Sequence, residues 1–387
     1  MPGPHHVLLI PGFFGFANLN DFAYFGHVRD YLAEIGPGHG LDGEIRVVET
    51  PPTASLRKRA ARLAEAIGKL LDESPPNARV SLVGHSSGGL DARLVVSPEV
   101  SLPTSADVRR AAAAVPAVVC VSTPHLGTPL AHLFNTLLGQ QLLRVLSVAT
   151  IYSLRAGRLP LKVVLRLARL FQRQDAPADG MIESLARDLL ADFSKPRRLA
   201  IEEFLENLGK DQDLLGQITP GGMDLFNAST GDRPGVRYGC VVTRARAPGL
   251  RSALAAGLDP YAQATHALFV ALYRLGARTP KERTPRLDRQ QLIELRRAYG
   301  HRPDVSANDG MVPTLSQVRG TVVHAVWADH HDVIGHFHQP RHVPPHLDWL
   351  TSGSGFDRAG FELTWQRVVA WLAAGAPPQE ASGVGLA

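Results

Sequence analysis

The sequence predicts an α/β fold in which a mostly parallel sheet is flanked by helices. Two observations favour it. Short apolar runs alternate with amphipathic stretches through the first 130 residues, and strand patterns return after each of two mainly helical regions. Such alternation is typical of a parallel sheet covered on both faces. One sheet with two helical insertions explains the returning strands better than two consecutive domains do.

The predicted strands are short and apolar, and the helices between them have one apolar face. Strands are expected at residues 6–10, 45–49, 79–83, 117–122, 235–242 and 320–327. Helices are expected at residues 20–35, 55–72, 88–96, 252–278, 287–299 and 358–374. Their apolar residues recur at helical spacing, and caps or glycine–proline pairs mark several ends. Residues 130–215 predict several helices and no strand.

Composition narrows the class of protein. Of 387 residues, 44% are hydrophobic and 20% are charged, which is typical of a globular chain. The net charge of +5 is small for this length, and no nucleic-acid-binding motif accompanies it, so no nucleic-acid partner is expected. Cys120 and Cys240 lie in apolar runs, and we expect buried free thiols rather than a disulfide.

The first residues, MPGPHHVLLIPGFFGF, have neither the positively charged region nor the long apolar run of a signal peptide. No later run approaches the ~20 apolar residues of a membrane span. The sequence as given therefore predicts a cytoplasmic protein. An export signal outside this sequence would change that expectation.

Residues 84–88, Gly-His-Ser-Ser-Gly, fit the G-x-S-x-G motif and lie between an apolar strand and a helix, which is the context that the motif requires. In such a turn the hydroxyl of Ser86 stands clear of the sheet, and Gly84 and Gly88 allow close packing of helix on strand. The helix N-terminus faces any negative charge that develops on a substrate. Ser86 is therefore the candidate nucleophile, and the backbone N–H of Ser87 is a candidate donor to an oxyanion.

A serine nucleophile needs a base, and the base needs an acid that orients it. In hydrolases with this motif, the acid and then the histidine follow the serine along the chain. Asp309 lies in the run NDGMVP and precedes the stretch 324–346, HAVWADHHDVIGHFHQPRHVPPH, which holds seven of the sixteen histidines. The candidate groups thus occur in the expected order.

Several separate stretches resemble the bacterial true lipases of the α/β-hydrolase fold. They are PGFFGF at 11–16, GHSSGG at 84–89, STPHLGTPLA at 122–131, GVRYGCVVT at 235–243, NDGMVP at 308–313 and DHHDVIG at 329–335. The family's matching segments are HG-x-x-GF, the nucleophile elbow, APH-x-GS, GV-[RK]-YYSW, NDG-[LI]-V and DHL-[ED]-x-[IV]-G. The resemblance implies the α/β-hydrolase fold, a helical lid insertion and cleavage of ester bonds.

The resemblance also implies roles for individual residues. Those that match the catalytic triad are Ser86, Asp309 and His330. Those whose backbone N–H groups match the oxyanion donors are Phe13 and Ser87. Of the neighbours His330 and His331, the motif selects the first. Pro11 departs from the family, which has histidine before this glycine, so the loop is held differently while the amide of Phe13 stays available.

The other histidines do not predict a metal site, because their spacings match no short zinc signature. In lipases with the matching motif, the residue aligned with Asp332 can contribute to a calcium site. Asp332 is therefore a weak candidate ligand, and a structural calcium ion stays an open alternative that needs more oxygen ligands. His85 and His125 are expected to pack or hydrogen-bond locally. The histidines expected in a loop near the mouth of the active site are His336, His338, His342 and His346.

Residues 152–173 place basic side chains on one face of a predicted helix: Arg155, Arg158, Lys162, Arg166, Arg169 and Arg173. Two interpretations stay open. The helix can pack its apolar side on the core, or it can lie at a lipid surface with its basic residues near anionic head groups. Because the resembling lipases carry a lid here, we assign residues 131–232 to a lid or cap. The hydrolase core then comprises residues 1–130 and 233–387, with a helical excursion at about 250–300.

The sequence therefore predicts a serine ester hydrolase that cleaves lipid-like acyl esters through an acyl-enzyme and requires no cofactor. Its expected partner is a lipid or a small acyl-ester substrate. The alternatives are an acyltransferase, a thioesterase or a polyester depolymerase with the same three residues, and a lipid-binding relative without turnover. Competent residues at every catalytic position disfavour the last alternative.

Overall fold

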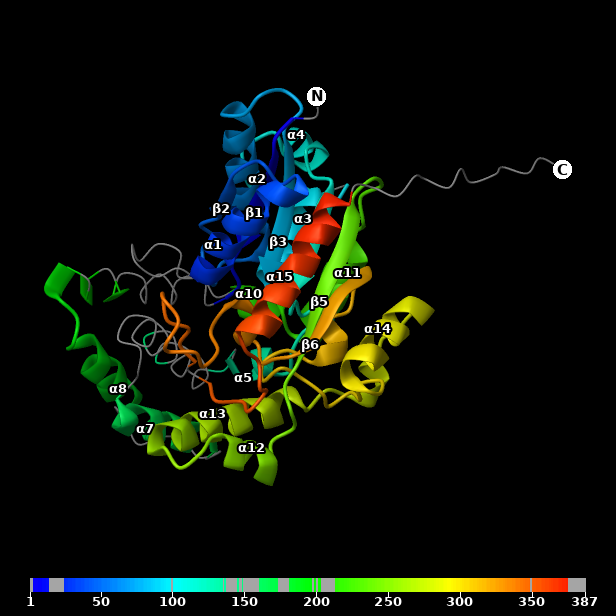
Figure 1. The fold of residues 1–387 in the computed structure, drawn as a ribbon. Helices are drawn as coiled ribbons and strands as arrows, with labels where there is room; N and C mark the ends of the chain where they lie inside the picture. Colours follow the sequence, from blue (N-terminus) through cyan, green and yellow to red (C-terminus); the bar gives the residue numbers. More distant parts are fainter. Residues whose placement is uncertain are drawn as a thin grey trace.

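In the computed structural model, the described residues are 3–13, 24–98, 100–134, 136, 145, 148, 160–172, 181–196, 198–199, 201–202, 213–348 and 350–374. Within them, parallel strands form one six-stranded sheet in the order β2-β1-β3-β4-β5-β6 (Figure 1). The strands are β1 His5–Ile10, β2 Ile45–Val47, β3 Arg79–His85, β4 Ala117–Val121, β5 Arg237–Arg244 and β6 Thr321–Trp327. The predicted architecture of a mostly parallel sheet between helices is confirmed.

Helices cover both faces of this sheet (Figure 1). On one face, α2 (Leu56–Asp72) packs on α3 (Gly88–Val96), and α3 lies against β3 and β4. On the other face, α1 (Gly26–Ile35) and α15 (Arg358–Ala373) pack on each other. The sheet is therefore buried on both sides, which explains why its central strands are almost continuously apolar.

The remaining helices lie in the connections between strands. Between β3 and β4 lies α4 Val108–Ala113. Those between β4 and β5 are α5 Leu130–Phe134, α7 Leu161–Gln172, α8 Met181–Leu190, α10 Asp213–Gln217 and α11 Pro220–Ser229. Those between β5 and β6 are α12 Leu250–Ala255, α13 Pro260–Gly276 and α14 Arg289–Tyr299. Helices α5, α7, α12 and α13 lie beyond the carboxyl ends of the strands (Figure 1). The division into core and lid stays a prediction.

Two predicted helices differ from the observed ones. The helix expected at 252–278 is divided, because Gly257 adopts φ +70° and Asp259 caps a new helix by accepting a hydrogen bond from the amide of Tyr261. The helix expected at 20–35 begins only at Gly26 in the described part of the chain, and residues 20–23 lie outside it. Tyr24 precedes the helix in a turn, where its side chain is buried against the sheet.

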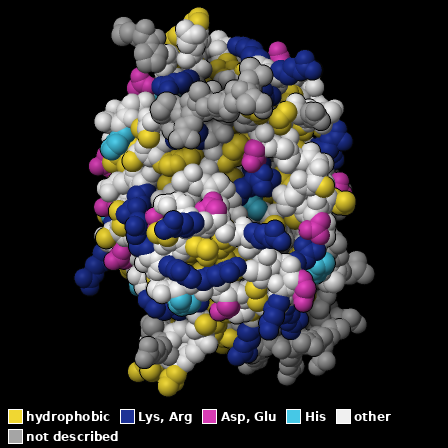
Figure 2. Space-filling model, turned by 90° about the vertical axis from the view of Figure 1, so that its right-hand side faces the viewer, with side chains coloured by type: hydrophobic (Ala, Val, Ile, Leu, Met, Phe, Trp, Pro, Cys, Tyr) yellow, Lys and Arg dark blue, Asp and Glu magenta, His cyan; other side chains and the backbone are white. Residues whose placement is uncertain are grey.

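Cys120 and Cys240 are buried free thiols, as predicted. They occupy neighbouring positions in the adjacent strands β4 and β5. No helix in the described ranges is both long and apolar enough to cross a membrane. On the face shown in Figure 2, the Lys and Arg side chains lie in separate groups with acidic, hydrophobic and uncharged side chains between them.

Candidate active site

Ser86 lies in the sharp turn between β3 and α3. Its φ angle of +55° is in the left-handed region that non-glycine residues seldom adopt. The turn requires glycine at position 84, because a Cβ on Gly84 would collide with the backbone of Gly88. The amide of Ser86 donates a 2.9 Å hydrogen bond to the carbonyl of Val121, which ties the turn to β4. Ser86 thus has the strand–turn–helix position that its motif predicts.

Asp309 and His330 come together beyond the carboxyl end of the sheet. The Nδ1 atom of His330 lies 2.8 Å from Oδ2 of Asp309, and both side chains are buried. The His330 amide also donates to the Asp309 carbonyl at 2.9 Å. Because a carboxylate only accepts, Nδ1 carries the proton, and Nε2 of His330 is the basic nitrogen.

The Asp309 carboxylate is held by groups other than the histidine. Its Oδ1 accepts hydrogen bonds from the backbone amides of Met311 at 3.0 Å and Val312 at 2.7 Å. Its Oδ2 also accepts from Thr243 Oγ1 at 2.8 Å and Gln317 Nε2 at 3.1 Å. These bonds fix the orientation of the carboxylate toward His330. Thr243 and Gln317 are functional candidates that the sequence patterns did not indicate.

Ser86 and His330 line one pocket that is open to solvent. Most of its other lining residues are apolar: Phe13, Pro124, Leu130, Ala131, Phe134, Leu215, Ile218, Met311 and Val312. Several come from α5 and α10, in the region between β4 and β5. A mainly apolar pocket that reaches a serine and a basic nitrogen can accommodate an acyl chain.

The loop after β1 lies directly against Ser86. A Cβ on Gly12 would come within 2.6 Å of the Ser86 Cβ, so only glycine permits this approach. The next residue, Phe13, is among those that line the pocket. Ser87 follows the nucleophile at the first turn of α3. The structure thus brings Phe13 to the pocket of Ser86, and Ser87 follows Ser86 directly in the chain.

A buried ion pair holds the same loop. Arg59 of α2 makes a bidentate contact with Asp91 of α3, and neither side chain is exposed to solvent. Arg59 Nη2 also donates a 2.8 Å hydrogen bond to the carbonyl of Pro11. Burial raises the pKa of Asp91 to about 6, although the nearby guanidinium lowers it. Arg59 thus holds Pro11, the position at which the resembling lipases have a histidine. No sequence motif indicated this role of Arg59.

His85 connects the loop of His330 to the loop after β1. Its Nε2 lies 2.8 Å from the His330 carbonyl oxygen and its Nδ1 lies 2.6 Å from the Tyr24 hydroxyl. The carbonyl only accepts, so Nε2 donates to it and Nδ1 accepts from the hydroxyl. Tyr24 also hydrogen-bonds to the backbone of Gly12. Burial holds the pKa of His85 well below its usual value, which keeps the ring neutral. The expected local hydrogen bonding of His85 is confirmed.

Asp332 belongs to an acidic cluster close to His330. Its carboxylate lies with those of Asp329 and Asp348, with oxygens within 4.8 Å of one another. Burial, followed by repulsion from neighbouring carboxylates, raises the pKa of all three groups well above the usual value. Ser354 Oγ and the amide of Asp329 donate to Asp332 Oδ2. Several carboxylate oxygens at one point are the donor set that calcium prefers.

Helix α7 packs on α13 and buries Val163, Val164 and Leu167. Leu161 and Leu165 are exposed, and so are Lys162 and Arg166. The side chain of Arg166 lies 3.7 Å from Asp188 of α8. The predicted basic residues Arg155, Arg158 and Arg173, and the side chain of Arg169, lie outside the described part. The described portion therefore combines a core-packed side with exposed leucines and basic residues.

His336, His338, His342 and His346 lie in the loop segment between β6 and α15, as expected, but not at the mouth of the site. His336 and His346 are buried, and the pocket that contains Ser86 is lined by none of the four. His125, by contrast, braces a loop as expected, because its carbonyl accepts from Asn227 and its ring contacts Arg93.

A family model described as "Putative serine esterase (DUF676)" matches residues 50–159, which include Ser86. No curated protein sequence gives a significant match. Solved structures provide further similarity. The chain aligns with lipase 1 from Pelosinus fermentans at 16% identity and TM-score 0.52, over 95% of this chain and 98% of that one.

Two more solved structures have similar values. EstA from Clostridium botulinum aligns at 17% identity and TM-score 0.52, covering 97% of this chain and 90% of that one. Staphylococcus hyicus lipase aligns at 16% identity and TM-score 0.50, covering 96% and 95% respectively. At this identity the similarity establishes the fold, which is that of the α/β-hydrolases. Together with the family match, it favours the class of serine ester hydrolases.

Proposed function

We propose that this chain is a serine ester hydrolase that cleaves lipid-like acyl esters through an acyl-enzyme. The observation that carries the proposal is the hydrogen bond between Asp309 and His330 at a pocket that Ser86 also lines. The mainly apolar lining supports an acyl substrate, and the serine esterase family match supports the ester bond.

In the proposed mechanism, Ser86 Oγ attacks the ester carbonyl carbon while His330 Nε2 takes the hydroxyl proton. Asp309 keeps the ring in the required tautomer and stabilises its cationic form. The amides of Phe13 and Ser87 donate to the oxyanion, and losing one such donor commonly costs on the order of 3 kcal/mol of barrier. The alcohol leaves with the proton from His330. Water then attacks the acyl-enzyme by the same route, releasing the acid and restoring Ser86.

Hydrolysis of p-nitrophenyl esters of increasing acyl length tests this proposal. The wild type is expected to turn over esters with a preference that the pocket sets, and Ser86→Ala is expected to lose turnover at every length. Ser87→Ala is the matched control, because its proposed role uses a backbone amide that the substitution keeps. Equal rates for the wild type and Ser86→Ala would reject the proposed nucleophile.

We propose in addition that Asp329, Asp332 and Asp348 hold a structural calcium ion. The donor set supports this, since calcium would neutralise two buried carboxylates and one half-buried carboxylate and hold the loop that follows His330. The ion takes no part in the chemical steps. Added calcium is expected to raise the Tm of the wild type and to leave that of Asp348→Asn unchanged. If added calcium leaves the Tm of the wild type unchanged, the proposed calcium site is rejected.

The exposed leucines and basic residues of α7 support contact with a lipid surface, and we propose this helix as part of a lid. The rate on one ester is expected to rise when its concentration passes the micellar transition. Leu165→Asn should reduce that rise, whereas Leu363→Asn, which changes an exposed leucine of α15, should not. An unchanged wild-type rate across the transition would count against the lid.

A further inference from the structure

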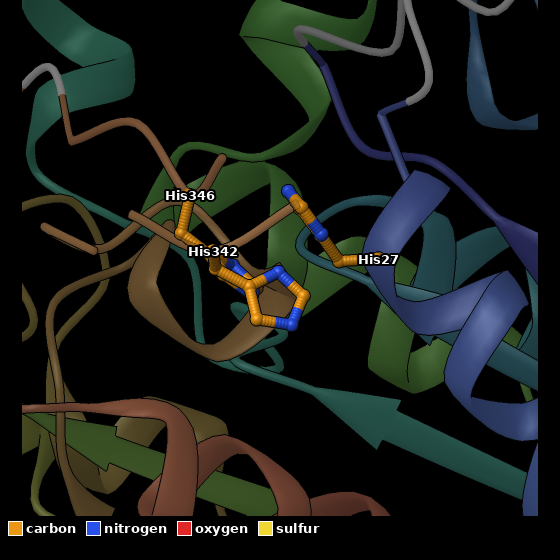
Figure 3. A group of neighbouring side chains, drawn as sticks. All are labelled: His27, His342 and His346. Atoms are coloured by element: carbon orange, nitrogen blue, oxygen red, sulfur yellow. The ribbon is translucent and has the colours of Figure 1, made fainter. Parts of the chain in front are cut away.

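Three histidines from distant parts of the chain meet outside the pocket that contains Ser86. His27 lies in the first turn of α1, and His342 and His346 lie in the segment between β6 and α15 (Figure 3). A ring nitrogen of each lies within 4.8 Å of one of each of the others. His346 is buried, and His27 and His342 are half-buried, so the cluster is reachable from solvent.

Backbone carbonyls fix the tautomers of these rings. His342 Nδ1 lies 2.8 Å from the carbonyl oxygen of Pro344, and His346 Nδ1 lies 2.7 Å from that of Gly335. Because a carbonyl only accepts, both Nδ1 atoms carry protons and both Nε2 atoms keep their lone pairs. The His27 ring similarly hydrogen-bonds to the backbone of Pro345. Such a bond from the second ring nitrogen is the usual support of a metal-binding histidine.

Burial favours the neutral form of His27 and His346, and a metal-binding histidine must be neutral. Burial is the largest cause that lowers the pKa of His27, and it contributes most to lowering that of His346 to about 3. The charged neighbours are Arg358, whose Nη1 lies 3.2 Å from His346 Nε2, and Asp30, which faces His27. Arg358 also pairs with Glu362 at 2.6 Å and lies over the ring of Tyr31, so it has other partners if it leaves His346.

We propose that His27, His342 and His346 form a binding site for a divalent d-block cation of the zinc class. Three neutral imidazole nitrogens suit zinc, copper or nickel rather than calcium or magnesium, which prefer oxygen ligands. A three-histidine zinc site is completed by a water molecule, which can reach the cluster because His27 and His342 are half-buried. The site is separate from the acidic cluster, whose donors are all carboxylates.

Binding requires one local adjustment. The rings of His27 and His346 are stacked, with centroids 3.7 Å apart and planes 20° from parallel. Lone pairs lie in the ring plane, so stacked rings direct them side by side rather than toward one point. For the lone pairs to converge, the His27 ring must turn about its Cβ–Cγ bond. A bound cation would then link the start of α1 to the segment after His330, which already passes close to His27, since a Cβ on Gly335 would come within 2.8 Å of the His27 Cβ.

The test is metal binding by the full chain, purified without a polyhistidine tag and stripped of metal. Zinc chloride is titrated into the wild type in competition with a chromophoric chelator. One high-affinity equivalent is expected, and His342→Gln is expected to weaken it at least tenfold. His338→Gln is the matched control, since it removes an exposed histidine of the same segment that is not in the cluster. The zinc affinity of His338→Gln should equal that of the wild type.

Two further readouts separate this site from others and from misfolding. Zinc should raise the Tm of the wild type and of Asp348→Asn, which alters only the acidic cluster, but not that of His342→Gln. Cobalt should give the strong visible bands of a four-coordinate site with three nitrogen ligands in the wild type and lose them in His27→Gln. Absence of a saturable zinc equivalent, or equal zinc affinity for the wild type and a correctly folded His342→Gln, would overturn the proposal.

Discussion

His85 donates a hydrogen bond from Nε2 to the main-chain carbonyl of His330, with the two atoms 2.8 Å apart. The bond joins the residue before the candidate nucleophile to the backbone of the candidate base. Tyr24 extends this link toward Gly12, because its hydroxyl bonds to both His85 and the Gly12 backbone. One buried chain of hydrogen bonds therefore relates the base to the loop that carries the Phe13 amide.

Replacing Tyr24 by Phe is expected to reduce kcat more than it changes KM. The substitution leaves the buried Nδ1 of His85 without a donor, at a cost on the order of 1–3 kcal/mol. It also loosens the Gly12 loop. Tyr31→Phe is the matched control, because Tyr31 is equally buried, lies on α1 and bonds to Gln366 away from the pocket. Equal losses of kcat in the two variants would show that the Tyr24 network has no special role.

Replacing Asp309 by Asn is expected to lower kcat by about 10⁴-fold, because the amide no longer selects the His330 tautomer with a basic Nε2. The fold should persist, since the new side chain keeps the shape of the old one. Asp304→Asn removes a carboxylate five positions earlier that accepts hydrogen bonds from Ser306 and Ala307. Steady-state kinetics should give nearly wild-type kcat for this control, and a comparable loss in both variants would contradict the assignment.

Replacing Arg59 by Met is expected to destabilise the protein by about 3–5 kcal/mol, because Asp91 then becomes a buried carboxylate without its partner. The double variant Arg59→Met/Asp91→Leu should recover much of this loss in denaturant unfolding. It should nevertheless remain less active, since the Pro11 carbonyl has lost its donor. Full activity in the double variant would show that this tether does not position the Gly12–Phe13 loop.

Acid is expected to destabilise the protein partly through His5. Burial, aided by Arg79, lowers the pKa of His5 to about 4, whereas the unfolded chain protonates near 6.5. The unfolded state therefore binds the extra proton between these values, and stability falls as the pH falls from 6.5 to 4. Between pH 7 and pH 5, the wild type should lose about 2 kcal/mol more than His5→Gln. Parallel stability curves for the two proteins would contradict this expectation.

Local pattern was sufficient to predict the sheet and the position of Ser86. A strand, two small residues around a serine and a following helix are contiguous, so their geometry depends on few distant contacts. Asp309 and His330 were found because they also stand in recognisable runs at strand ends. The late start of α1 was not predicted, since Tyr24 interacts with the sheet instead of continuing the helix toward the N-terminus.

Side chains that act through tertiary contacts could not be predicted. Arg59 reads as one more basic residue on an amphipathic helix, and only the packing of α2 on α3 brings it to Asp91 and Pro11. A metal-binding role of His27 could not be predicted either, because its partners His342 and His346 lie at the other end of the chain. The spacings of His342 and His346 alone match no metal signature, and the third nitrogen comes from α1.

Reaction of the folded chain with a fluorophosphonate probe tests the central claim most directly. Such a probe phosphonylates a serine only when a neighbouring base activates it. Peptide mass spectrometry should locate a single adduct on Ser86, absent from Ser86→Ala and strongly reduced in Asp309→Asn. A folded wild type that stays unlabelled, or an adduct on another residue, would contradict the assignment of Ser86, His330 and Asp309 as a catalytic triad.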